Sequence, residues 1–204
     1  VYYYVRHPKP SRVKSLFKRV VKAAEAAAMG TETEVSVEVM HGNYPVLPNH
    51  TLARVVHENL VALGGVEYDQ AEQKFAENIQ ASFQIPRLPL GSEQQVQPYS
   101  FRQGMGSTDV GDVSWLVPTV GFTTATWVPG TSAHSWQAVA AGGMSIGHKG
   151  MHLATKLLAQ TAVDLIQSPS LITAATEELE RSQGPDFKYA ALLGDRQPPL
   201  DYRR

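Results

Sequence analysis

The sequence contains no cysteine. This absence excludes a disulfide framework, thiolate metal ligands and a cysteine nucleophile. The sequence also lacks any stretch approaching the roughly 20 apolar residues that a membrane-spanning helix requires. Its first residues do not show the basic and then apolar order of a signal peptide. We therefore expect a cytoplasmic protein without a membrane partner.

An excess of charge of one sign is missing as well. The 18 Lys and Arg residues nearly cancel the 19 Asp and Glu residues, and no basic stripe or block of like charge is present. This balance argues against nucleic acid and acidic membranes as partners. With 204 residues, of which 43% are hydrophobic, the chain is long enough to bury a core as one large domain or two small ones.

The first forty residues show the pattern of a strand, a helix and a second strand. Residues 1–6 are rich in β-forming side chains and are followed by two prolines, which end strand pairing. Ser11 can cap a helix whose apolar residues recur at helical spacing as far as Gly30. Valines alternate with polar residues over 35–39, which predicts a strand with one buried face.

Two strands and one helix are too few for independent stability, so we expect this region to need a second protomer or a segment outside the chain. Val1 to Val5 is typical of the middle of a strand. We therefore expect the chain to start inside a larger protein.

The rest of the chain alternates helical patterns with loops. Asn49 and Asp69 can cap helices that reach Gly64 and Phe83, and a loop rich in Pro, Gly, Gln and Ser covers 85–111. Short β-type runs follow at 115–120 and 122–128, and a glycine-rich stretch over 140–150 leads into a helix ending near Gln167. A further helix is expected near 170–182, before a proline-rich tail from about 184.

His134 is the first candidate for chemistry. It lies in a loop of small residues directly after a predicted strand, and Trp127 and Trp136 flank it. Loops at strand ends often carry ligands and catalytic groups. Imidazole is the commonest transition-metal ligand at neutral pH, and the tryptophans would keep such a site dry. The alternative is a loop histidine that bonds to a backbone carbonyl.

Asp109 and Asp112 form the second candidate, in a glycine-rich turn. Carboxylates in such a turn can bind a metal, orient a metal-bound histidine or contact substrate. Aspartates also favour turns because their side chains bond to nearby backbone amides. The local sequence leaves both interpretations open.

His148 and His152 are four residues apart and so share one face of a helix, as zinc-binding pairs do. Lys149 lies between them, in place of the glutamate that a zinc peptidase helix carries, so an exposed helix start is favoured. The other histidines stand beside prolines, in turns or on the polar side of a helix, and are predicted to be surface residues: His7, His41, His50 and His57.

Three ordered motifs together resemble the C-terminal half of the aminobenzoyl-glutamate hydrolase family and its amidohydrolase relatives. They are Gly106-Ser107-Thr108-Asp109-Val110-Gly111-Asp112-Val113-Ser114-Trp115, then Gly130-Thr131 with His134-Ser135-Trp136-Gln137, and then Ser145-Ile146-Gly147-His148-Lys149-Gly150-Met151. The resemblance extends upstream through Tyr44-Pro45-Val46-Leu47-Pro48-Asn49 and the opening run with Arg6. It covers nearly the whole chain apart from about the last twenty residues.

The resemblance implies an α/β fold. Members of this superfamily of two-zinc aminoacylases and carboxypeptidases have an α/β catalytic domain, interrupted by an α+β lid that usually mediates dimerisation. On this picture residues 1–43 are the second half of the lid, and residues 44–204 are the C-terminal half of the catalytic domain with its tail. We therefore expect a homodimer formed through the lid, or a complementary N-terminal segment as partner.

The resemblance also implies a metal-dependent amidohydrolase, with two divalent metals (zinc or manganese) in the intact protein. His134 matches the late metal ligand of the family, and Asp109 and Asp112 match supporting positions that contact substrate or orient a ligand. The matching general base is a glutamate in the missing N-terminal half, so no catalytic residue is assigned in this chain. Since a catalytic zinc has about three protein ligands, His134 alone should not hold a metal tightly.

Three functional hypotheses follow. The first is a portion of an amidohydrolase or peptidase that cleaves the amide bond of an N-acyl amino acid or an aminobenzoyl-glutamate-like small molecule, and that is inactive as this chain alone. The second is a non-catalytic partner that pairs with a complementary chain. The third is a binding module that keeps the hydrolase sequence without its activity.

Overall fold

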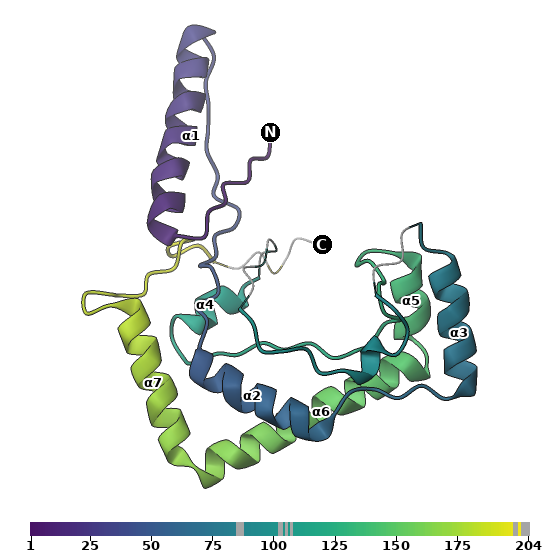
Figure 1. Ribbon diagram of the computed structural model, residues 1–204. Coiled ribbons are helices and arrows are strands. Elements are labelled where there is room, and N and C mark those ends of the chain that lie inside the picture. Colours follow the sequence, from purple (N-terminus) through teal and green to yellow (C-terminus); the bar gives the residue numbers. More distant parts are fainter. Residues whose placement is uncertain (85–87, 102–103, 105, 107, 198–199, 201–204) are drawn as a thin grey trace. The chain divides into compact units, whose positions relative to one another are not determined.

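The computed structural model describes residues 1–84, 88–101, 104, 106, 108–197 and 200. The chain divides into two compact units, each of which is described by itself. The first comprises residues 1–48, 104–119 and 179–204, and the second comprises residues 49–103 and 120–178. Parts of the predicted loop over 85–111 and of the predicted tail fall outside the described residues. The chain is drawn in Figure 1.

The predicted α/β fold is wrong, because the described residues form helices and no strand. The β-type runs at 1–6, 35–39 and 122–128 are instead irregular, and the run at 115–120 begins as the cap of a short helix. A strand needs a neighbour that pairs with its backbone. In the described part of the chain these runs have no such neighbour, and Val35, Val37 and Val39 are 43%, 50% and 37% exposed.

The predicted long helices are confirmed. They can be predicted from local sequence because an α-helix makes its hydrogen bonds within its own segment. They are α1 (Pro10–Gly30), α2 (His50–Leu63), α3 (Gln70–Ala81), α6 (Ser145–Gln167) and α7 (Pro169–Gln183). Asn49 caps α2 by accepting a hydrogen bond from the Leu52 amide. At α3, Asp69 and Glu72 form a reciprocal capping box.

Short elements were not predicted. They are the 3₁₀ helix η1 (Ser92–Gln94), α4 (Val110–Ser114) and α5 (Trp136–Gly142). In addition, α6 begins at Ser145, inside the stretch that the sequence suggested was a glycine-rich lead-in. The described helices include none that is both long and apolar enough to span a membrane.

The second unit contains a hydrophobic cluster of buried side chains from α3, α5, α6 and the segment before His134. The cluster consists of Ala76, Ile79, Val128, Ala141 and Ile146. Helix α6 packs against both α2 and α5 (Figure 1). Gly150 allows α6 to approach the preceding segment, since a Cβ atom there would lie 2.5 Å from the carbonyl oxygen of Ala125. The packing therefore depends on a residue without a side chain.

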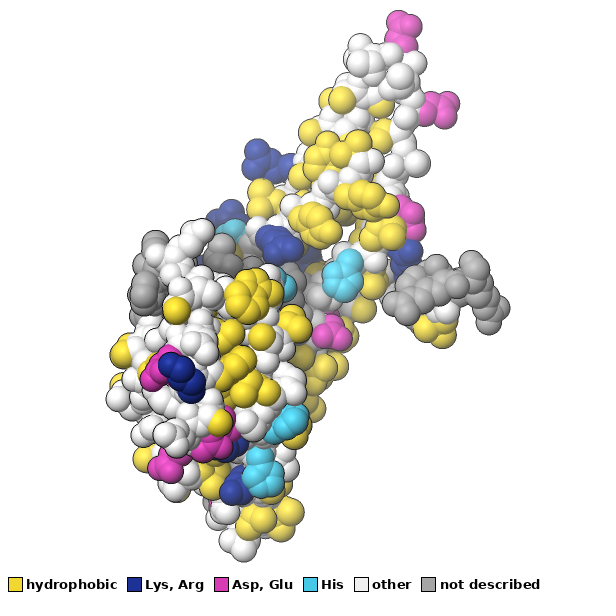
Figure 2. Space-filling model, turned by 90° about the vertical axis from the view of Figure 1, so that its right-hand side faces the viewer, with side chains coloured by type: hydrophobic (Ala, Val, Ile, Leu, Met, Phe, Trp, Pro, Cys, Tyr) yellow, Lys and Arg dark blue, Asp and Glu magenta, His cyan; other side chains and the backbone are white. Residues whose placement is uncertain are grey.

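The first unit is organised around the buried ring of Tyr44. The rings of Trp115 and Tyr189 each lie 5.4 Å from it, centroid to centroid, and Phe187 stacks on Trp115 at 4.7 Å. Helix α1 contributes little to this core, since Ala28 is its one buried residue. Figure 2 shows hydrophobic side chains lying open on the surface of α1 and its flanking segments.

Candidate functional site

The His134 loop, defined as residues 127–137, runs from the hydrophobic cluster into the first turn of α5. Val128 and Pro129 are buried at its start, whereas His134 is exposed. Gly130 and His134 both adopt positive φ angles, of 86° and 59°. Positive φ is natural for glycine, but for a residue with a side chain it is uncommon and is often found at functional sites. The backbone of His134 is therefore held in an unusual conformation.

Local hydrogen bonds end the loop sharply at the start of α5. The hydroxyl of Ser135 accepts a hydrogen bond from the Ala138 amide and donates one to the carbonyl of Ser132. Ser135 thereby caps α5 and fixes the residues on both sides of His134. The sequence signal for this cap is a serine three residues before Ala138, but a helix of seven residues is too short to show a clear period.

The imidazole of His134 lines a hollow of about 430 Å³. Two indole rings and small side chains line this hollow with it, from Trp127, Ser135, Trp136, Ala138 and Val139. Trp127 and Trp136 are 38% and 62% exposed, so the hollow is open. The geometry presents one accessible imidazole at an apolar surface.

Asp112 lies inside α4, in the first unit, and both of its oxygens have partners. Its Oδ2 accepts a hydrogen bond from the Tyr44 amide at 3.1 Å, and its Oδ1 accepts one from the Tyr189 hydroxyl at 2.8 Å. This hydrogen bond, more than burial, raises the pKa of the Tyr189 phenol. Asp112 thus ties three segments of the aromatic core together.

Asp109 immediately precedes α4 and is exposed. Its side chain makes no capping hydrogen bond to the helix, and its Oδ1 lies 3.5 Å from the hydroxyl of Thr108. The two aspartates therefore have different surroundings. Asp112 is bonded within the aromatic core, and Asp109 is open to solvent. His134 belongs to the other compact unit.

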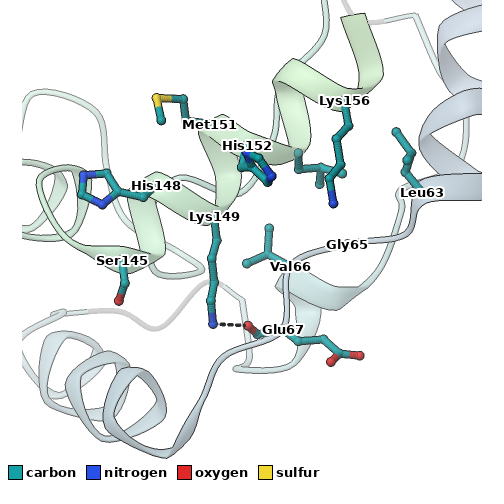
Figure 3. A pocket seen from close by; sticks show the side chains of 11 residues that line it. Leu63, Gly65, Val66, Glu67, Ser145, His148, Lys149, Met151, His152 and Lys156 are labelled. Carbon is teal, nitrogen blue, oxygen red and sulfur yellow. Dashed lines mark hydrogen bonds between the residues drawn. The ribbon is translucent and has the colours of Figure 1, made fainter. Parts of the chain in front are cut away.

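His148 and His152 are exposed on α6 and line a second hollow, of about 540 Å³, with Leu63, Val66 and Lys156 (Figure 3). Their rings point in different directions from the helix in this view, His148 away from His152. Both side chains are exposed, as the sequence predicts for this part of the helix.

Among the described residues, Glu72 is the most buried charged residue, and no sequence pattern had singled it out. Its side chain is 2% exposed, and its Oε2 lies 2.5 Å from the ammonium nitrogen of Lys149. Lys149 also donates to the carbonyl of Glu67 (Figure 3). Burial favours the neutral acid, but hydrogen bonds from Lys149, Ser145 and the Asp69 amide outweigh it and lower the pKa of Glu72. This ion pair joins α3 to α6.

Two of the remaining histidines have hydrogen-bond partners. The Nδ1 of His50 lies 2.5 Å from the hydroxyl of Tyr99, and the Nδ1 of His7 accepts the Lys9 amide. His41 and His57 are not part of any metal-binding group among the described residues. In that part of the chain, no three His, Asp or Glu side chains are placed to hold a metal ion.

Comparison with known proteins first indicates a class. No family model matches the chain. Two curated relatives do, and both are hydrolases by name, one of them a dipeptidase.

The first relative is a subunit of the p-aminobenzoyl-glutamate hydrolase of Escherichia coli strain K12, with 32% identity over 203 residues, covering 87% of this chain and 42% of the relative. The second is the Xaa-Arg dipeptidase of Mus musculus, with 29% identity over 181 residues, covering 87% of this chain and 35% of the relative. The predicted resemblance is confirmed. The chain spans less than half the length of the relatives it matches.

Proposed function

We propose that this chain is the C-terminal portion of a metal-dependent amidohydrolase. The complete protein would cleave the amide bond of an N-acyl amino acid or an aminobenzoyl-glutamate-like substrate. The observation that carries the proposal is the 32% identity to the p-aminobenzoyl-glutamate hydrolase relative over 87% of the chain. The second relative, a dipeptidase, supports the same bond type.

Within this function, His134 supplies one ligand to a site that holds two divalent metals, zinc or manganese, in the complete protein. An exposed imidazole in an apolar hollow suits this role, because neutral imidazole is a metal ligand and the indoles limit access of water. The other ligands and the general-base glutamate come from the part of the relatives that this chain does not cover. The chain alone is then inactive.

Asp109 and Asp112 have different parts in this proposal. Asp109 is free to contact a substrate or to orient a ligand, since it is exposed. Asp112 has a supporting role within its own unit, since its oxygens hold Tyr44 and Tyr189.

The proposed domains follow the family. Residues 1–43 are the second half of a lid and residues 44–204 the C-terminal half of a catalytic domain. The open apolar side chains of the first region, among them Val35 and Val37, support a covering partner there. That partner is the rest of the lid or a second copy of the protein, in a cytoplasmic homodimer.

The proposal is tested in the protein expressed from its complete reading frame. Hydrolysis of p-aminobenzoyl-glutamate is measured with zinc or manganese for the parent protein and for His134→Ala and His152→Ala. We expect His134→Ala to lower kcat by at least about 100-fold, as loss of a metal ligand should, and His152→Ala to retain activity. Equal activity of the parent and His134→Ala would contradict the proposal.

A further inference from the structure

Two of the three tryptophans of the chain lie in the His134 loop, and both are unusually open. The third, Trp115, shows how an indole is normally held: its ring packs on Phe187 at 4.7 Å, and its N–H donates to the carbonyl of Pro45 at 2.8 Å. Among the described residues, Trp127 and Trp136 have neither a ring partner nor an acceptor for the N–H, and they are 38% and 62% exposed. Clustered apolar side chains that stay exposed mark binding surfaces.

Helix α5 gathers these apolar groups around the hollow beside His134. Trp136 and Val139 are three residues apart and so share one face of α5, where Val139 is 78% exposed. Trp127 lies beside the end of the same helix, since its indole nitrogen is 3.8 Å from the place of a Cβ atom on Gly142. The hollow measures about 430 Å³. Sites for small molecules typically measure roughly 300–1,000 Å³, so a ring fits here.

The polar groups that line the hollow are few, and none of the described ones is a carboxylate. The hydroxyl of Ser135 is already engaged, because it accepts from the Ala138 amide and donates to the Ser132 carbonyl. The imidazole of His134 has no hydrogen-bond partner among the described residues, and an indole N–H can only donate. Aromatic faces together with free donors suit an aromatic ring that carries a carbonyl oxygen.

This surface is formed in advance, because the loop is held to α3 on both sides. The amide nitrogen of Gln80 donates to the carbonyl of Pro129 at 3.0 Å, and that of Gln137 donates to the hydroxyl of Ser82 at 3.1 Å. Val128, in the same loop, belongs to the hydrophobic cluster and is 1% exposed. A ligand that binds a preformed surface loses little affinity to ordering it.

We propose that Trp127 and Trp136 form the binding surface for the ring of an aromatic acyl group. This inference rests on the proposed function and narrows its substrates to amides whose carbonyl carbon is bonded directly to an aromatic ring. Because His134 lines the same hollow, a ring held by the indoles keeps the amide close to that residue. The two tryptophans then determine specificity, since a substrate without a ring leaves both indole faces open.

The first test is the binding of benzamide, which has the ring and the carbonyl oxygen but no charge. It is added to the 204-residue chain with isotope-labelled tryptophan, whose three indole N–H resonances are assigned with Trp127→Leu and Trp136→Leu. We expect benzamide to move the resonances of Trp127 and Trp136 until they saturate, and to leave that of Trp115 in place. Acetamide, which has the carbonyl and no ring, should move none of them.

The second test compares hydrolysis of N-benzoyl-glutamate and N-acetyl-glutamate by the complete protein. We expect Trp136→Leu to lower kcat/KM about 10-fold for the benzoyl substrate and less than about 2-fold for the acetyl substrate, because only the former loses a ring contact. The matched control is Phe101→Leu, which removes a ring that is 61% exposed in the same unit and does not line the hollow. It should change neither value by more than about 2-fold.

Unmoved Trp127 and Trp136 resonances up to the solubility limit of benzamide, or equal losses for the two substrates in Trp136→Leu, would overturn the inference even if His134→Ala is inactive. Resonances that move in the 204-residue chain but not in the complete protein would also overturn it, because another part of the protein would then cover the hollow. Moved resonances in a complete protein that hydrolyses neither substrate would support the ring site and contradict the proposed function. Thermal midpoints show whether each variant is folded, and if Trp136→Leu is not, Trp127→Leu decides both tests.

Discussion

The His134 loop and the first forty residues differ in how much of their structure the chain itself supports. The loop begins with buried residues, is attached twice to α3 and leads into a capped helix. The first forty residues contain a helix with one buried residue, followed by valines that are 37% to 50% exposed. The first region is packed by residues of this chain, whereas the second presents apolar surface without cover among the described residues.

This difference shows what each kind of secondary structure requires. Helix α1 forms because its hydrogen bonds are internal, although its apolar face has little to pack on. The alternating valines at 35–39 have the pattern of a strand but need a partner from elsewhere. If this division is correct, substitutions in the packed region should lower stability and matched substitutions in the open region should not.

The largest effect is expected from Lys149→Met. The substitution leaves the carboxylate of Glu72, which is 2% exposed, without its cation. Breaking a buried pair on one side is strongly destabilising, and since Lys149 is itself 40% exposed we expect a loss of about 2–3 kcal/mol in the free energy of unfolding. Urea denaturation measures this loss.

The matched control is Lys74→Met, since Lys74 forms an ion pair with Glu77 in which the two side chains are 74% and 50% exposed. We expect a change below about 0.5 kcal/mol there. Equal effects of the two lysine substitutions would show that the α3 and α6 attachment is not a stabilising feature.

A slightly smaller effect is expected from Gly150→Ala. The new Cβ would lie 2.5 Å from the carbonyl oxygen of Ala125 and 2.7 Å from a methyl of Thr126, so the backbone must shift. Overpacking of this kind lowers stability by about 2 kcal/mol. Gly30→Ala, where no atom lies within 4 Å, should be neutral or slightly stabilising. Thermal unfolding of both variants checks the difference, and a stable Gly150→Ala would contradict the close packing.

Valine to threonine substitutions compare the two regions directly. Val128 is 1% exposed and Val37 is 50% exposed. A buried hydroxyl without a partner lowers stability by about 1–3 kcal/mol, whereas an exposed one changes it by less than about 0.5 kcal/mol. If Val37→Thr in the isolated chain were as harmful as Val128→Thr, the first forty residues would be packed by this chain after all.

The smallest effect concerns pH. The folded-state pKa of Glu72 is lowered from 4.5. Burial would raise the pKa of Glu178, but bonds from the Thr51 side chain and the His50 and Thr51 amides outweigh burial and lower it too. A depressed pKa stabilises the fold above the unfolded value and loses this contribution as pH falls through 4.5 toward the folded value. We therefore expect the urea concentration at the unfolding midpoint to decrease when the pH is lowered below about 4.5, and to decrease less in Glu72→Gln. An identical decline in that variant would contradict the assignment.

The long helices could be predicted from the sequence, whereas His134 stays a predicted site residue. Asn49 and Asp69 each start a helix as predicted, because a cap and its helix are neighbours in sequence. The strand predictions were wrong. A period of two indicates that a segment could form a strand, but it does not indicate whether a partner strand is present. Gln80 and Lys149 act through contacts 49 and 77 residues away, which no local pattern reveals.

We propose that this chain furnishes one imidazole, that of His134, to a hydrolytic site that other residues complete. The most direct measurement is hydrolysis of p-aminobenzoyl-glutamate by the purified 204-residue chain with added zinc or manganese. We predict no turnover above that of the metal alone. Turnover by the chain that disappears in His134→Ala would contradict the claim, because the whole site would then lie within these residues.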